Sequence, residues 1–170
     1  MLKDLFEISY GNKFDNNKME HDNPSVNFVS RTEKNNGVSA IVDKIQDIEP
    51  FDAGNMTIAL GGSIGKCFVQ VEPFYTGQNM AVLYTKELST ETKIFLSNII
   101  MTEAHIRFCA FGRELNRHIK TDFSIRLPIQ RNVDGSPKKD ISCKYNSNGY
   151  IPDWDFMETY IKSLLYGDRI

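Results

Sequence analysis

The sequence lacks a long apolar run and is poor in cysteine. No segment approaches the roughly 20 residues that a membrane helix needs, and the opening MLKDLFEISYG lacks the basic-then-apolar form of a signal peptide. The three cysteines, Cys67, Cys109 and Cys143, lie far apart and form no Cys-x-x-Cys pair. At least one thiol is unpaired, which is typical of a reducing compartment, so we expect a cytoplasmic protein.

Catalytic and metal-binding patterns are missing as well. His105 and Cys109 could share a helix face, but no second pair of ligands accompanies them at metal-binding spacing. The glycine-rich residues 61–66 are one position short of a phosphate-binding loop, and Cys67 stands where that loop needs a hydroxyl. The sequence therefore predicts no catalytic residues, no metal and no cofactor of its own, and it favours a binding module over an enzyme.

Length and composition predict one globular domain that covers residues 1–170, since 41% of the chain is hydrophobic and 25% is charged. The net charge of −2 is unevenly spread, because residues 105–145 carry 9 Lys or Arg and only 4 Asp or Glu. Such asymmetry marks either a surface that faces a polyanion or an ordinary solvated face. Charge counting alone leaves both interpretations open.

Two kinds of apolar pattern predict the secondary structure. Short alternating or β-branched-rich runs predict strands at residues 5–10, 26–30, 38–42, 56–60, 67–71, 80–84 and 123–128. A helix is expected at residues 89–104, capped by Ser89 or Thr90, and a second at residues 152–165, capped by Asp153. The apolar stripe of the second helix consists of Trp154, Met157, Ile161 and Leu164.

Polar segments connect these elements. Residues 31–37 form the long tip of a hairpin, residues 61–66 and 75–79 form glycine-bearing loops, and residues 130–149 form a polar hairpin or loop. Residues 112–120 are rich in basic side chains, and if they are helical, Arg113, Arg117 and Lys120 share one face. Long loops on a rigid scaffold often carry function, so a nucleic-acid surface is favoured over a plain polar one.

The candidate DNA contacts combine positive charge with side-chain amides. Cations attract phosphates, whereas Asn and Gln pair with adenine edges and Arg or Lys with guanine. We expect Arg113, Arg117, His118 and Lys120 to contact phosphates or bases. Base reading from the loop tips is assigned to Arg31, Lys34, Asn35, Asn36, Ser63, Lys66, Gln78 and Asn79.

Five stretches, taken in order, resemble a known family. They are LFEISYGNKF, VNFVSRTEKNNGV, GNMTIALGGSIGKCFVQVEPFYTGQNMAVL, FGRELNRHIKTDFSIRLPI and IPDWDFMETYIKSLLYGDRI. Together they look like a target recognition domain, the DNA-reading module of the specificity (S) subunit of type I restriction–modification systems and related type II enzymes. The last stretch is similar to the carboxyl ends of recognition domains in fused or BcgI-like type II systems. No single stretch is specific by itself, so their order carries the resemblance.

The resemblance implies an α+β fold with a twisted, mostly antiparallel sheet or partial barrel and helices on one side. It implies a sequence-specific DNA-binding module that reads one half of a split site and does no chemistry. A partner or fused N6-adenine DNA methyltransferase and endonuclease would be directed to that half-site. S-adenosylmethionine would then bind the methyltransferase and not this chain.

One departure affects the expected assembly. A full S subunit has two recognition domains separated by long helices, whereas this chain has the pattern of one. The resemblance therefore leaves an excised domain, a half-subunit that forms a homodimer, or the tail of a larger enzyme. The alternative function is a protein-interaction module, an S-subunit mimic that docks on a methyltransferase through its last helix without binding DNA.

Overall fold

Residues 1–165 and 167, the part of the chain that the computed structural model describes, form two β-sheets, two α-helices and four short 3-10 turns. The larger sheet has the strand order β1-β7-β4-β5, and all its neighbouring strands are antiparallel. Its strands are β1 (Glu7–Tyr10), β4 (Met56–Ala59), β5 (Cys67–Val69) and β7 (Met80–Tyr84). The smaller sheet has the order β3-β2-β6, with β2 antiparallel to β3 and parallel to β6. Its strands are β2 (Val26–Val29), β3 (Val38–Val42) and β6 (Phe74–Thr76).

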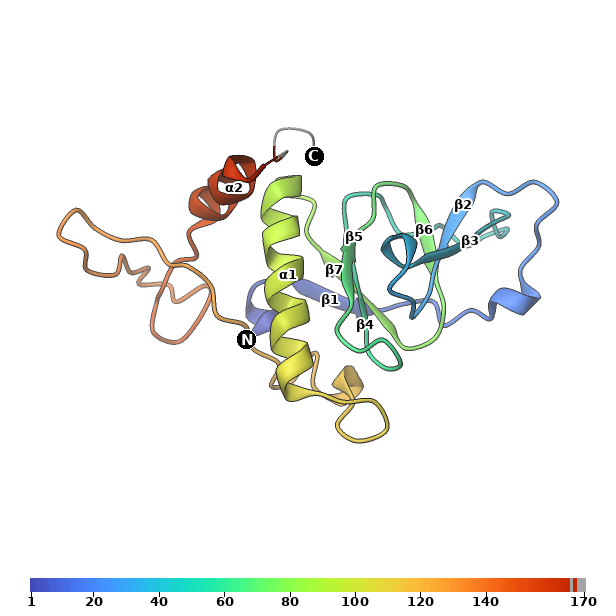
Figure 1. Ribbon diagram of the computed structural model, residues 1–170, viewed down its shortest axis with the longest axis horizontal. Helices are drawn as coiled ribbons and strands as arrows, with labels where there is room; N and C mark the ends of the chain where they lie inside the picture. The colour runs from blue at the N-terminus through green and yellow to red at the C-terminus, as the bar shows by residue number, and fades with distance from the viewer. Residues whose placement is uncertain (166, 168–170) are drawn as a thin grey trace.

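The sheets and helices lie in layers (Figure 1). Helix α1 (Thr90–Arg107) covers one face of the larger sheet, and α2 (Trp154–Ser163) packs on the outer side of α1. The smaller sheet covers the opposite face of the larger one. The 3-10 turns are η1 (Leu2–Asp4), η2 (Asn16–Lys18), η3 (Asn35–Gly37) and η4 (Leu115–Arg117). The predicted α+β class with mostly antiparallel strands and helices on one side is confirmed, and the strands of the described residues do not close into a barrel.

Strands β4 and β7 are buried on both faces, because side chains alternate between the two sides of a sheet and both sides are covered. Toward α1 the core contains Met56, Ile58, Ala81, Leu83, Leu96, Ile100 and Ala104. Toward the smaller sheet it contains Val29, Ala59, Phe74, Met80 and Val82. Each large side chain buried in this way contributes about 1.5–3 kcal/mol. The two cores therefore hold β4 and β7 firmly, and the loops that leave these strands start from fixed points.

The predicted first helix is confirmed, including its cap. The Oγ of Ser89 accepts a hydrogen bond from the backbone N–H of Thr92 at 3.2 Å, and Glu91 lies in the first turn, where the helix dipole favours negative charge. The helix continues to Arg107, three residues beyond the predicted end. The second helix is shorter than predicted, and Leu164 lies beyond its last turn as an exposed side chain. Asp153 caps that helix as expected, accepting from the N–H of Phe156 at 3.1 Å.

The strand predicted in the second half of the chain is wrong. Residues 123–128 alternate between apolar and polar side chains but are not a strand, because their backbone has no neighbouring strand with which to pair. Phe123 is fully buried against the core, so the alternation reflects packing alone. The sequence left open whether residues 112–120 are helical; they contain only η4, so Arg113, Arg117 and Lys120 do not share a helical face. The residues from 75 to 79, predicted as a loop, begin with the last two positions of β6.

Gly65 allows the loop between β4 and β5 to pass close to α1. Its φ is +77°, and a Cβ built on it would lie 2.2 Å from the Cβ of Ala104. Gly135 has a similar φ of +82°, but a Cβ there would meet nothing within 4 Å. Comparing the same substitution at the two glycines therefore separates the effect of backbone conformation from that of a steric clash.

We predict that Gly65→Ala lowers the free energy of unfolding by about 2–5 kcal/mol, which combines roughly 1–2 kcal/mol of left-handed strain with an overpacking cost. Gly135→Ala is the matched control and should cost only about 1–2 kcal/mol, the strain alone. Urea denaturation followed by circular dichroism measures both values. Equal losses in the two variants would contradict the close approach of this loop to α1.

Candidate nucleic-acid interface

Four loop segments that are far apart in the sequence meet at one end of the larger sheet. A Cβ built on Gly62 would lie 3.6 Å from the Cβ of Arg31, so the β4–β5 loop touches the segment after β2. A Cβ on Gly61 would lie 3.6 Å from Nδ2 of Asn79 and 3.5 Å from Oε1 of Glu114. Figure 1 shows the β4–β5 loop and the chain that follows α1 at the same end of the molecule. We call this region the loop-end surface; it comprises Arg31, residues 61–66, Gln78, Asn79 and residues 113–120.

The turn between β6 and β7 is held by backbone hydrogen bonds. The carbonyl of Asn79 accepts from the N–H of Leu60 at 2.8 Å, and the N–H of Gly77 donates to the carbonyl of Val29 at 2.8 Å. Asn79 has a φ of +55°, a left-handed conformation that Asn adopts more readily than most residues. Gln78 is exposed beside it. The two amide side chains therefore extend from a fixed turn, which suits them to contact a ligand.

On the loop-end surface, the charge of Lys66 is compensated by a carboxylate on the neighbouring hairpin tip. Its Nζ lies 3.0 Å from Oε2 of Glu33, and both side chains are substantially exposed. An exposed pair of this kind contributes little stability because solvent screens it. The pair does link the β4–β5 loop to the tip of the β2–β3 hairpin.

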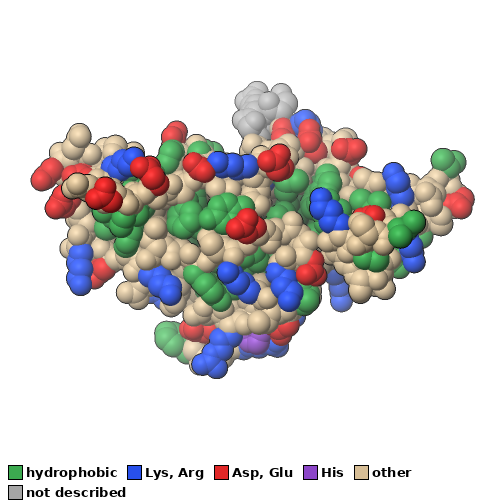
Figure 2. Space-filling view, turned by 180° about the vertical axis from the view of Figure 1, so that it is seen from behind, with side chains coloured by type: hydrophobic (Ala, Val, Ile, Leu, Met, Phe, Trp, Pro, Cys, Tyr) green, Lys and Arg blue, Asp and Glu red, His purple; other side chains and the backbone are tan. Residues whose placement is uncertain are grey.

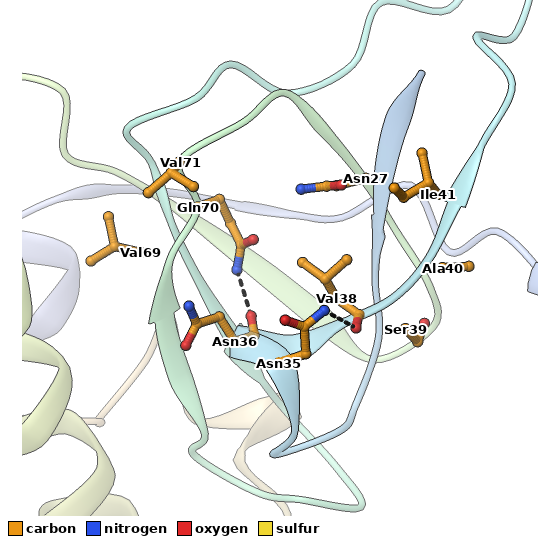
Figure 3. Close-up of a pocket in the computed structure, with 10 residues that line it drawn as sticks. All are labelled: Asn27, Asn35, Asn36, Val38, Ser39, Ala40, Ile41, Val69, Gln70 and Val71. Atoms are coloured by element: carbon orange, nitrogen blue, oxygen red, sulfur yellow. Dashed lines mark hydrogen bonds between the residues drawn. The ribbon is translucent and has the colours of Figure 1, made fainter. Parts of the chain in front are cut away.

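Asn35 and Asn36 do not join the loop-end surface. They line a separate groove of about 310 Å³ that runs between β3 and the end of β5 (Figure 3). The nearly buried Gln70 donates from Nε2 to the carbonyl of Asn36 and to Oγ1 of Thr57, both at 2.9 Å. Asn35 donates from Nδ2 to the carbonyl of Val38 at 3.2 Å. These bonds fix the hairpin tip along β5, so the two asparagines face a different hollow from Arg31.

Asp122 organises the basic segment that follows α1. Its Oδ1 lies 2.7 Å from Nδ1 of His118, and its Oδ2 lies 3.6 Å from the Arg113 guanidinium. The ring of Phe108 supports both groups, with its centroid 5.3 Å from the His118 ring and 5.1 Å from Cζ of Arg113. The hydrogen bond with His118, followed by that with Thr121, lowers the pKa of the Asp122 carboxyl below its ordinary value of 3.8. Asp122 therefore stays charged and holds Arg113 and His118 in place.

Several contributors to this surface were not among the sequence candidates. The Nζ of Lys120 lies 4.9 Å above the ring of Tyr10, and the Tyr10 hydroxyl donates to the carbonyl of Asn116 at 3.2 Å. Lys13 approaches the same ring at 6.0 Å. Tyr10 is 41% exposed at the end of β1, and an exposed aromatic beside a lysine-bearing loop is the signal that could have identified it. Glu114 was also missed, because the sequence interpretation counted only cations and amides.

The loop-end surface is predominantly positive. In the described part of the chain, no carboxylate lies within 4.0 Å of the charged groups of Arg31, Arg117 or Lys120. Lys34, on the hairpin tip, is likewise without an ion pair among those residues. Figure 2 shows Lys and Arg side chains over the lower part of the molecule, with a histidine near its lower edge. Free cations beside polar loops suit a polyanionic ligand.

Cys67 is a buried thiol in the core beneath this surface. Burial raises the pKa of the Cys67 thiol, so this sulfur remains protonated and inert. Within residues 1–165 and 167, no group of three or more His, Cys, Asp or Glu side chains is placed to hold a metal ion. The helices of the same residues include none with the length and apolar character needed to cross a membrane.

Comparisons with known proteins identify the family of this chain. Residues 1–132 match the family described as the type I restriction modification DNA specificity domain. This chain belongs to that family. A curated relative, the type II restriction enzyme BgcI specificity subunit S.BcgI of Heyndrickxia coagulans, is 25% identical over 167 residues, which are 97% of this chain and 42% of the relative. The chain thus spans about two-fifths of the length of that relative.

A solved structure shares the fold. The type I restriction–modification S subunit from M. genitalium superposes with a TM-score of 0.52 at 11% identity, over 71% of this chain and 31% of the other. The predicted resemblance to a specificity-subunit recognition domain is confirmed by the family match and by these two proteins. The family is one of DNA-recognition domains of restriction–modification systems and is not itself catalytic. The individual contact residues predicted from the sequence stay predictions.

We predict that His118→Ala raises the pKa of the Asp122 carboxyl toward 3.8, because the largest cause of its depression is removed. Thr121→Val is the matched control and should raise the same pKa by less. A carboxyl with a lowered folded-state pKa stabilises the protein above its ordinary pKa, and that contribution disappears as the pH falls through the lowered value. Carbon-13 NMR titration of Asp122 measures each pKa. An unchanged pKa in His118→Ala would show that the hydrogen bond does not form in solution.

Proposed function

We propose that this chain is the sequence-specific DNA-binding module of a restriction–modification system, reading one half of a split target site. The observation that carries the proposal is the convergence of separate loops into one cationic surface in a member of the DNA specificity-domain family. In this proposal the chain supplies recognition and no chemistry. A partner or fused N6-adenine DNA methyltransferase, which binds S-adenosylmethionine, and an endonuclease act at the site.

The loop-end surface divides into two kinds of group. Arg31, Arg117 and Lys120 are positive and without ion pairs among the described residues, so they serve as phosphate contacts that give affinity and set the register on the duplex. Gln78 and Asn79 project from a rigid turn and read base edges in the major groove. Arg113 and His118, braced by Asp122, add contacts in fixed positions.

The assembly remains open to two arrangements. Because the chain spans 42% of S.BcgI, it can act as one recognition unit of a longer subunit or as a half-subunit that forms a homodimer. A symmetric dimer reads a palindromic pair of half-sites, whereas a longer subunit reads two different ones. The arrangement of the assembly therefore determines which second half-site is read.

A second candidate function has one observation in its favour. Helix α2 exposes Phe156 and Tyr160 to solvent by 49% and 46%, and the two rings stack at 6.1 Å. An S-subunit mimic could dock on a methyltransferase through this face without binding DNA. A DNA mobility-shift assay with and without the methyltransferase separates the two functions, since the mimic would shift no DNA in either case.

The direct test of the proposed function maps methylated adenines across the genome of cells that express the intact system. We expect one consistent half-motif to disappear when this chain is deleted and to return when it is restored. A control strain that lacks the endonuclease alone should keep the motif. Methylation that is unaffected by the deletion would contradict the proposal.

We predict that Arg117→Ala with Lys120→Ala weakens DNA binding and makes the plot of log affinity against log salt shallower, by about 0.9 for each phosphate that is no longer neutralised. Lys86→Ala is the matched control, because Lys86 follows the opposite end of β7 and pairs with Asp52 at 2.6 Å. The control should leave the slope unchanged. Fluorescence anisotropy at several salt concentrations measures the slopes, and equal slopes in all three proteins would remove Arg117 and Lys120 from the interface.

A further inference from the structure

Glu114 is an acidic residue in the middle of a positive surface. It follows Arg113 directly and precedes Arg117 by three positions. Its Oε1 lies 3.5 Å from the position of a Cβ built on Gly61, so the carboxylate lies beside the β4–β5 loop. Its side chain is half-buried. The surrounding cations offer partners, yet Glu114 is not in an ion pair with any described residue.

No structural role in the fold explains this carboxylate. Glu114 occupies the position before η4, but its side chain makes no capping hydrogen bond there. Of the nearby basic groups, Arg113 pairs with Asp122 at 3.6 Å and Lys120 lies over the ring of Tyr10, whereas Arg117 has no ion pair among the described residues. A carboxylate among phosphate-binding groups repels phosphates and so opposes non-specific DNA binding. The Glu114 carboxylate is therefore better placed to face a hydrogen-bond donor than a phosphate of the DNA backbone.

Donors of the required kind lie on base edges. An ionised carboxylate only accepts hydrogen bonds, and in the major groove cytosine and adenine each present an exocyclic amino group that donates. Guanine and thymine present acceptors at the corresponding positions, which a carboxylate repels. A glutamate that reaches the groove thus distinguishes amino-bearing bases from the others.

The surroundings of Glu114 leave room for base edges. Glu114 lines a hollow of about 570 Å³ together with residues 111–113 and 116–118, and a hollow of about 340 Å³ adjoins it. Asn116 lines both hollows, and Gln78 and Asn79 line the second. Gly61 has no side chain, so the Asn79 amide and the Glu114 carboxylate approach the same point from two loops. An amide and a carboxylate beside each other can read neighbouring base pairs.

We propose that Glu114 is a base-reading residue that accepts a hydrogen bond from the exocyclic amino group of cytosine or adenine in the recognised half-site. This inference rests on the proposed function and assigns one position of the DNA motif to one side chain. Glu114 sets specificity and, being negative, adds nothing to the attraction for phosphates.

The test selects bound sequences from a random double-stranded DNA library with the wild-type chain and three variants. In the wild type we expect a motif with cytosine or adenine at the position that Glu114 reads, and the selected base shows which amino group is bound. Glu114→Ala should lose the preference at that one position by about 10-fold or more and keep the others. Glu114→Gln retains an acceptor and gains a donor, so its preference should move toward adenine. Glu87→Ala, the matched loss of a carboxylate beyond the opposite end of β7, should keep the wild-type motif.

Two further measurements distinguish a loss of base reading from a loss of phosphate contacts or of stability. The salt slope of Glu114→Ala on a non-specific duplex should equal that of the wild type, because no phosphate contact is removed. Its melting temperature should also be unchanged, since the Glu114 side chain makes no hydrogen bond to another described residue. A wild-type motif that persists in Glu114→Ala overturns this inference alone. Failure of the wild type to select any motif overturns the proposed function, and this inference with it.

Discussion

The pairing of β4 with β7 is the constraint on which the rest of the structure depends. Met56 opposite Leu83 and Ile58 opposite Ala81 face α1, and the alternate positions face the smaller sheet. A slip of one residue would exchange the two sets, which differ in size, and both cores would lose their fit. The register is therefore fixed from both sides. Because the β4–β5 loop and the β6–β7 turn leave these strands, the same register fixes where Gly61 and Asn79 meet.

Charge on the loop-end surface falls into two groups with different consequences. Arg113 and Lys66 are held by carboxylates of the same chain, so their positions are defined but part of their charge is already compensated. Arg31 and Arg117 are not compensated by any described carboxylate. Paired cations cost less reorganisation on binding, whereas free cations supply most of the attraction for a polyanion. A surface that combines both kinds gains attraction from one group and orientation from the other.

The sequence predicted the elements whose signals are local and missed those that tertiary contacts decide. The strands from 38 to 42 and from 80 to 84 and the Ser89 cap follow from side-chain pattern and hydrogen-bonding chemistry, and the structure has them at the predicted positions. The alternation of residues 123–128 looked like a strand, but core packing of an unpaired segment produces the same pattern. The proximity of Glu114 to Gly61 could not be predicted, because it joins residues more than fifty positions apart through a non-helical segment. Asn35 and Asn36 were grouped with Arg31 by sequence proximity, but they line another groove, where the carbonyl of Asn36 accepts a hydrogen bond from Gln70.

The same separation of scaffold and surface explains how a domain of this kind can change what it reads. Gln78 and Arg117 are exposed and contribute no side chain to the cores, so their replacement should alter stability by no more than about 0.5 kcal/mol. Gly65 and Ala104, by contrast, set the distance between the β4–β5 loop and α1 and tolerate no larger side chain at the glycine. The positions where packing limits substitution therefore lie beneath the loops and not on their exposed surface. The side chains proposed to contact DNA can therefore be exchanged while the fixed turns continue to present them at the same place.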